Sequence, residues 1–233
     1  MTGSGCGKSR FLLLHLCPAL LAAALLLAPG TTYIDSAISG WFFDPVTHKF
    51  PLRYSAAFEI VTHHWAKYLV VLVAGAVITV WLFSFVTPEL KGHRRLLLFL
   101  SLALTLAPAA VSLLKAGNPR HCPYDLAEYG GHAVHIGLFE PAPPGQEPGH
   151  CFPGGHASAG FSLLAFYFTG LALGNRRLAR AGLWGGMAAG LAFGMARVAQ
   201  GAHFLSHNLW SALVCWLVIL ALYGAIIGPR TPQ

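Results

Sequence analysis

The sequence predicts an all-α integral membrane protein, a single polytopic domain over residues 1–233 built as a six-helix bundle with an outer-face loop and interfacial helices. Apolar residues make up 55% of the chain and charged residues only 10%, whereas a soluble domain carries about 25% charged residues. So few charges cannot cover a water-facing surface of this size. The basic residues, which give a net charge of +7, fall in short clusters between apolar runs. This pattern is typical of cytoplasmic loops and excludes a nucleic-acid interface.

Six apolar runs predict the helices of the bundle. A helix of about 20 residues crosses the hydrocarbon core of a bilayer. The expected helices cover residues 11–29, 66–87, 96–115, 156–174, 181–200 and 207–228. Because these runs are continuously apolar and do not alternate, they favour helices over a β-barrel.

Basic clusters orient these helices. They precede the first run, separate the second from the third and the fourth from the fifth, and follow the sixth, so all fall on one side. That side is predicted to be the cytoplasm of a bacterial-type inner (plasma) membrane, with both termini there. Segments 30–65 and 116–155 then lie on the periplasmic side. The first run also fits a cleaved signal peptide, but its length and the lack of a clear cleavage site favour a retained helix.

Four ionisable residues are predicted to meet at the periplasmic face. Lys115 ends the third run, His156 begins the fourth, and Arg197 and His203 lie at the outer end of the fifth. A single cation at a helix end is usually an interface anchor, but four converging groups at this depth indicate a functional site.

These residue types suit phosphate chemistry. Lysine and arginine neutralise phosphoryl oxygens, and Gly154 and Gly155 allow backbone amides at a helix start to approach an anion. One histidine can attack phosphorus while a second protonates the departing oxygen.

Together the residues resemble the type 2 phosphatidic acid phosphatase superfamily of membrane lipid phosphatases. Its signature reads Lys-x6-Arg-Pro, Pro-Ser-Gly-His and Ser-Arg-x5-His-x3-Asp. The matching positions here are Lys115-x6-Cys122-Pro123, Pro153-Gly154-Gly155-His156 and Ala196-Arg197-x5-His203-x3-His207. The resemblance covers residues 66–228, and it implies a helical bundle that needs neither a metal ion nor another cofactor for catalysis.

The resemblance also implies roles. His203 is the expected nucleophile, which forms a phosphohistidine, and His156 is the expected acid. Lys115 and Arg197 are expected to hold the phosphate, together with the amides near Gly154 and Gly155.

Two departures from the signature affect the site. Cys122 stands in place of an arginine, for which Arg120 is a candidate substitute. His207 stands in place of the aspartate that orients the nucleophile, and a neutral imidazole supplies no negative charge. Other candidates for the orienting role are Asn208, Asp125 and Glu128. Without that charge, we expect activity to fall as the pH drops through about 6.5.

The outer segment contains further histidines and two cysteines. A disulfide between Cys122 and Cys151 is favoured over two free thiols, because both lie beside motifs in an oxidising compartment. A zinc site is a weaker alternative, because tight ligand pairs are missing. Its candidate ligands are His121, His132, His135, His150, His156, Cys122 and Cys151.

The sequence therefore predicts a lipid phosphatase or phosphotransferase of the membrane, with a lipid phosphate as its substrate and no nucleic-acid partner. Candidate substrates are phosphatidate, phosphatidylglycerophosphate, undecaprenyl pyrophosphate and the lipid A phosphates, and outward-facing chemistry favours the last two. One rival is a transporter, which should show ionisable groups near the bilayer midplane. The other is an inactive relative that binds lipid or acts as a scaffold, a possibility raised by Cys122 and His207.

Overall fold

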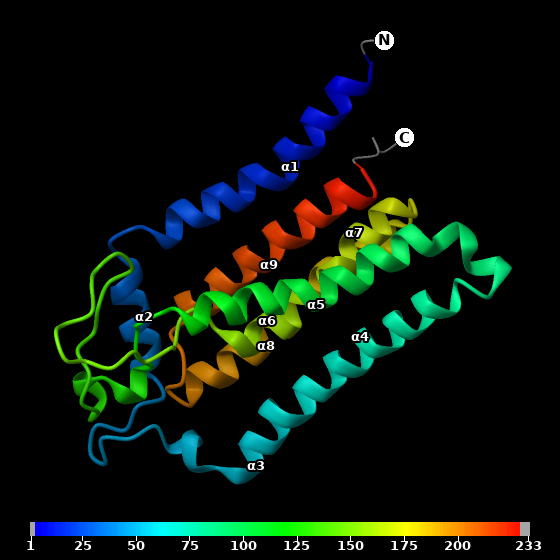
Figure 1. Ribbon diagram of the computed structural model, residues 1–233. Coiled ribbons are helices and arrows are strands. Elements are labelled where there is room, and N and C mark those ends of the chain that lie inside the picture. Colours follow the sequence, from blue (N-terminus) through cyan, green and yellow to red (C-terminus); the bar gives the residue numbers. More distant parts are fainter. Residues whose placement is uncertain (1–2, 229–233) are drawn as a thin grey trace.

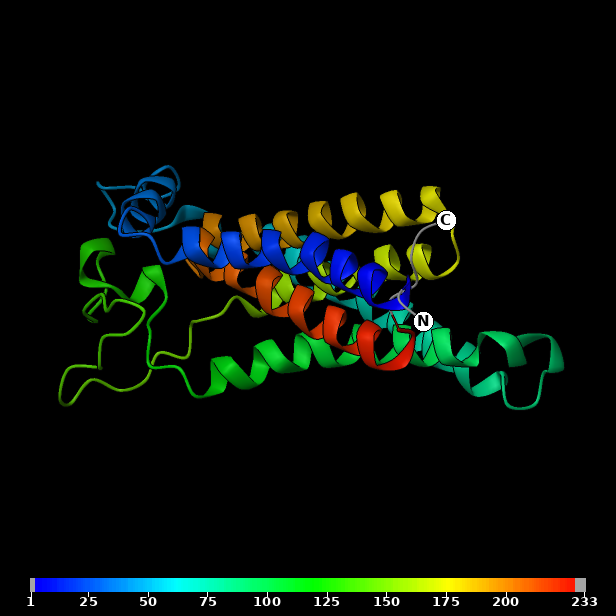
Figure 2. The same cartoon turned by 90° about the horizontal axis from the view of Figure 1, so that it is seen from above.

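The computed structural model describes the backbone of residues 3–228 and, within that range, the side chains of residues 9–62, 65 and 68–228. Long helices run side by side along one direction, and the longest loops gather at one end of the molecule (Figure 1). The start of α1 and the end of α9 lie at the opposite end, as the second view also shows (Figure 2). The prediction of an all-α fold is confirmed for the described residues, which form helices and only isolated β-bridges.

Each of the six predicted runs coincides with helical structure. The helices that correspond to these runs are α1 (Gly3–Leu26), α4 (Ala66–Phe83), α5 (Arg94–Ala116), α6 (Gly155–Ser162), α7 (Ala165–Ala172), α8 (Arg176–Ala199) and α9 (Leu205–Ile226). The outer segment after α1 adds α2 (Thr31–Gly40), a 3-10 turn at Pro51–Tyr54, α3 (Ala56–Glu59) and a π-helical turn at Ile60–Trp65. Further 3-10 turns cover Pro88–His93, Pro123–Asp125 and Ala127–Tyr129.

The fourth predicted helix differs from the expectation, because it is divided into α6 and α7. At the break, the amides of Leu163 and Leu164 donate to the carbonyls of Gly160 and Phe161, three residues earlier. Such i→i+3 bonds tighten a helical turn without ending the rod.

Three helical segments are long and apolar enough to cross a membrane: Ser9–Leu26, Pro88–Ala116 and Leu205–Ile226. Tyr68–Phe83 is a shorter apolar helix. Many large apolar side chains of α1 and α4 remain exposed, as Leu13 and Leu72 do at 61% and 70%. An unpartnered apolar surface of this extent fits a membrane protein. The remaining crossings of a six-helix bundle stay a prediction.

Close packing of α8 against α6 and α7 aligns the elements that carry the site. Buried glycines recur every fourth residue along α8, at positions 182, 186, 190 and 194. A Cβ atom at Gly160 of α6 would lie 2.4 Å from the backbone nitrogen of Gly190, so only glycine allows this approach. Small residues let membrane helices pack backbone to backbone. The approach fixes α6, which carries His156, against α8, which carries Arg197.

The Cys122–Cys151 disulfide joins the two ends of the outer loop and confirms the pairing expected from the sequence. Beside it, a small apolar cluster of Phe50, Leu126, Tyr129, Ala133 and Phe204 packs the loop against the start of α9. The segments that follow α5 and precede α6 are thereby held over the same end of the bundle (Figure 1).

Candidate functional site

His203 lies at the centre of the candidate site, in the connection between α8 and α9, and only 3% of its surface is exposed. Burial lowers the pKa of His203 well below its ordinary value. Four neighbours lower it further, namely His207, Lys115, Arg197 and His156 in decreasing order of effect. The imidazole is therefore neutral at neutral pH, which the expected nucleophilic role requires. Lys115, Arg197 and His156 therefore lie close enough to His203 to influence its charge.

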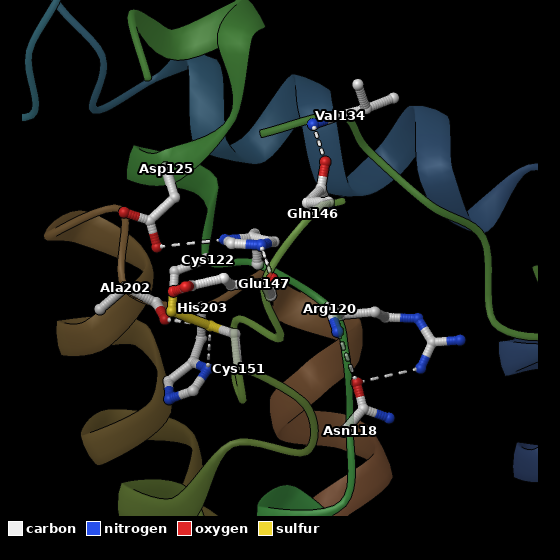
Figure 3. A network of polar contacts seen from close by, with 11 residues as sticks. Asn118, Arg120, Cys122, Asp125, Val134, Gln146, Glu147, Cys151, Ala202 and His203 are labelled. Atoms are coloured by element: carbon white, nitrogen blue, oxygen red, sulfur yellow. Dashed lines mark hydrogen bonds and ion pairs between the residues drawn. A yellow bond between two sulfur atoms is a disulfide. The ribbon is translucent and has the colours of Figure 1, made fainter. Parts of the chain in front are cut away.

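The ring nitrogen Nδ1 of His203 lies 3.4 Å from Sγ of Cys151 (Figure 3). That sulfur belongs to the disulfide and also lies 3.0 Å from the carbonyl oxygen of Ala202. A disulfide sulfur carries no proton, so it can only accept a weak hydrogen bond, and the contact fits the tautomer that has its proton on Nδ1. That tautomer would leave the lone pair on Nε2.

Arg197 at the end of α8 makes contacts that the sequence did not reveal. Its Nη1 donates to Oε2 of Glu59 at 3.2 Å and to Oε1 of Gln200 at 2.7 Å. Gln200 in turn donates from Nε2 to the same Glu59 oxygen at 2.7 Å. Meanwhile Nε of Arg197 is buried and has no hydrogen-bond partner among the described residues. A carboxylate thus lies on the guanidinium expected to bind phosphate, and Nε remains as a donor for an anion.

A second carboxylate fixes the start of α9. Asp35 of α2 is buried, and its carboxylate accepts hydrogen bonds from the backbone N–H of Ser206, at 2.8 Å, and from the Ser206 hydroxyl. Burial raises the pKa of Asp35, and the bonds from Ser206 oppose this shift. A carboxylate at a helix N-terminus also interacts favourably with the helix dipole. Asp35 therefore anchors the segment that contains His203 and His207, a role not anticipated from the sequence.

The glycines before His156 differ in their surroundings. The amide of Gly154 donates to the carbonyl of His207 at 3.0 Å, so it is already engaged. A Cβ atom at Gly154 would lie 2.3 Å from Oδ1 of Asn208, whereas one at Gly155 would meet nothing within 4 Å. Asn208 therefore accounts for glycine at the position where the signature has serine. The amides available at the start of α6 begin with Gly155.

The structure brings His207 close to His203, with ring centroids 5.8 Å apart and the planes at 66°. Its Nδ1 is buried and has no hydrogen-bond partner among the described residues. The other candidates for orienting His203 bind elsewhere. Asn208 donates to the carbonyls of Gly194 and Phe204, Asp125 lies 3.9 Å from His121, and Glu128 lies 3.5 Å from His135.

Arg120, the candidate substitute for the missing arginine, points away from His203 (Figure 3). Its guanidinium donates to the carbonyl of Gly137 at 2.7 Å and to Oδ1 of Asn118 at 3.3 Å. With His207 it lines a cavity of about 220 Å³ beneath the connection between α1 and α2. The sequence showed that Arg120 lies near the first motif, but it could not show which way the side chain points.

Possible metal ligands do not gather within the outer loop as the zinc alternative required. His121 binds the carbonyl of Glu147, and His135 lies against Glu128. Over the described part of the chain, the one group of three candidate ligands whose atoms lie within 4.8 Å of one another is Cys151, His203 and His207.

Comparison with known proteins gives one match. Residues 96–227 match the PAP2 superfamily, which covers more than half of the chain and all three signature regions. No curated protein and no solved structure matches the chain.

Proposed function

Because the chain belongs to the PAP2 superfamily, we propose that it is an integral membrane phosphatase that removes phosphate from a lipid through a phosphohistidine. Membership of the superfamily indicates phosphatase chemistry on phosphate esters. The observation that carries the rest of the proposal is the buried, neutral imidazole of His203 beside the charges of Lys115 and Arg197. The arrangement combines a nucleophile with fixed cations that stabilise charge on phosphoryl oxygens.

In the first half-reaction, Nε2 of His203 attacks phosphorus, a P–N bond forms, and the bond from phosphorus to the lipid oxygen breaks. His156 donates a proton to that oxygen, which leaves as an alcohol or, from a pyrophosphate, as a phosphate group. Lys115 and Nε of Arg197, which has no hydrogen-bond partner within the described part of the chain, hold the phosphoryl oxygens, together with amides at the start of α6.

In the second half-reaction, water attacks the phosphohistidine. His156 accepts the proton from water, the P–N bond breaks, and inorganic phosphate leaves with His203 restored. If an alcohol replaces water, the same steps give phosphotransfer. The carboxylate of Glu59 must leave Arg197, or share it, when phosphate enters.

The substrate is a lipid phosphomonoester or pyrophosphate. A site at the loop-bearing end of the bundle, opposite the end where α9 ends, fits chemistry at the periplasmic face of a bacterial inner membrane (Figure 2). This placement favours undecaprenyl pyrophosphate or lipid A phosphates over phosphatidate. An inactive lipid-binding relative is the second candidate, favoured by the carboxylate on Arg197 and the histidine at position 207.

Phosphate release from a panel of lipid phosphates tests the proposal, with purified protein in detergent and a metal chelator present. We expect turnover in chelator, and its loss in His203→Ala and His156→Ala proteins that keep wild-type thermal unfolding. His132→Ala, in the outer loop, is the matched control and should keep activity. Full activity of either site variant would refute the assigned roles, and binding of every lipid without phosphate release would establish the inactive relative.

A further inference from the structure

The Cys122–Cys151 disulfide lies directly beside two histidines of the site. Sγ of Cys151 is 3.4 Å from Nδ1 of His203, and one ring nitrogen each of His203 and His207 lies within 4.8 Å of the other and of that sulfur. Sγ of Cys122 is bonded to the same sulfur, so it belongs to the same cluster. Two sulfur atoms and two imidazoles therefore share one buried volume.

These four groups form a set that zinc commonly binds in proteins. Structural zinc sites use two cysteines and two histidines, with the histidines separated by three to five residues, and here His203 and His207 are separated by three. Ligand bonds of about 2.3 Å to sulfur and 2.1 Å to nitrogen place the two atoms about 3.6 Å apart in a tetrahedron. The observed 3.4 Å between Cys151 and His203 is close to that spacing. The buried Nδ1 of His207, without a partner among the described residues, supplies a second nitrogen.

We propose that the dithiol form of this cluster binds one zinc-like ion through Cys122, Cys151, His203 and His207. Formation of the site begins with reduction by an external dithiol. Residue Cys122 is 8% exposed whereas Cys151 is fully buried, so a thiolate of the reductant attacks Sγ of Cys122 and the Cys151 thiolate leaves. The second thiol of the reductant then displaces Cys122, the reductant becomes a disulfide, and both cysteines are reduced. The metal ion replaces the two thiol protons, which are released.

Charge favours this ligand set at a buried position. Two thiolates neutralise a divalent ion, whereas the two histidines alone would leave both positive charges uncompensated near Lys115 and Arg197. The disulfide form, which has no thiolate, lacks this neutralisation. The metal ion would also keep the two ends of the outer loop joined after the covalent bond is lost.

Binding would stop catalysis, a consequence that rests on the proposed function. Coordination through Nδ1 requires its lone pair, so the ring proton moves to Nε2, the atom that attacks phosphorus. The enzyme would then be active as the disulfide, and inhibited as the metal-bound dithiol.

Cobalt(II) provides a direct test, because thiolate ligation to it gives a charge-transfer absorption that needs no catalytic assay. The full chain in detergent is reduced, freed of metal and reductant under anaerobic conditions, and titrated with cobalt(II), then with zinc(II). We expect one equivalent bound with a thiolate-to-cobalt band in reduced protein, displacement of cobalt by zinc, and no such band in oxidised protein.

Variants locate the site. His207→Ala keeps the disulfide and should weaken cobalt binding by the reduced protein more than about 100-fold, since loss of even an outer-shell partner costs 10- to 100-fold. His132→Ala and His150→Ala are matched histidine controls in the outer loop and should bind as wild type does.

The proposal is overturned if reduced protein shows no thiolate-to-cobalt band, if oxidised protein shows the same band, or if the loop histidine variants lose it. Thermal unfolding gives a second measurement, in which zinc should raise the unfolding temperature of reduced protein but not of oxidised protein. Neither readout uses a lipid substrate. A protein without phosphatase activity that still forms the cobalt complex would contradict the proposed function alone.

Discussion

Replacement of Glu59 by glutamine should strengthen phosphate binding. Glu59 lies on Arg197, with 3.2 Å between Oε2 and Nη1, so in the proposed mechanism it competes with the substrate for that cation. The glutamine has the same shape and can still pack against Gln200, but it has no negative charge. The substitution therefore isolates the electrostatic part of the competition.

The size of the effect follows from the exposure of the pair. The side chain of Glu59 is 36% exposed and that of Arg197 is 19% exposed, so solvent screens the interaction substantially. Pairs of this kind contribute about 0.2 to 1 kcal/mol, and about 1 kcal/mol corresponds to a factor of roughly five in an equilibrium constant. We expect KM for the lipid phosphate, and the inhibition constant of inorganic phosphate, to fall by up to about fivefold.

Steady-state kinetics with a soluble short-chain lipid phosphate measures both constants, and Glu89→Gln, an exposed carboxylate beside the basic cluster before α5, is the matched control. A fall in KM with kcat nearly unchanged is the expected result. A large loss of kcat in Glu59→Gln would instead mean that the carboxylate takes part in the reaction, and the competition argument would be refuted.

Two further predictions concern pH and packing. Because the pKa of His203 is lowered well below its ordinary value, its imidazole stays neutral as the pH falls through about 6.5, so the acid limb of kcat/KM due to His203 should lie below that pH. If kcat/KM of the wild type falls around pH 6.5, and this fall disappears when another histidine is replaced, the acid limb belongs to that other histidine. Gly154→Ser restores the family residue but places its Cβ about 2.3 Å from Oδ1 of Asn208. It should destabilise the protein by about 1 to 3 kcal/mol, as measured by thermal unfolding, with recovery on adding Asn208→Ala and little change in Gly155→Ala.

The pH at which activity should fall is lower in the light of the structure than the value of about 6.5 expected from the sequence alone. An unperturbed histidine without a carboxylate partner should titrate near 6.5. The sequence could not show that His203 is almost fully buried and surrounded by two cations and two imidazoles. Burial and neighbouring positive charge both disfavour the protonated ring.

Local patterns in the sequence predicted the helices and the four ionisable residues of the site. The length of an apolar run, and the residues at its ends, can be read from the sequence directly. Lys115, His156, Arg197 and His203 were placed together on this basis. Contacts between distant segments left no such pattern. Glu59 meets Arg197 across 138 positions, and Asp35 meets Ser206 across 171. The only available signal was that Glu59 is the single acidic residue between Asp44 and Glu89.

Two departures from the family signature, Cys122 and His207, both lie close to the sulfur atom of Cys151. The signature arginine is replaced by Cys122, and this cysteine is bonded to Cys151. The Cys151 sulfur lies on Nδ1 of His203, on the side of the ring where an orienting group is needed. The disulfide, anchored through Cys122, therefore holds the proposed nucleophile by packing and by the contact at Nδ1, in place of a charged hydrogen bond. An aspartate at position 207 would place a negative charge at a buried position, and its desolvation cost would be offset in part by the nearby charges of Arg120 and Lys115. A neutral histidine at that position carries no such cost, so the histidine is compatible with a neighbouring disulfide that takes over the orienting contact.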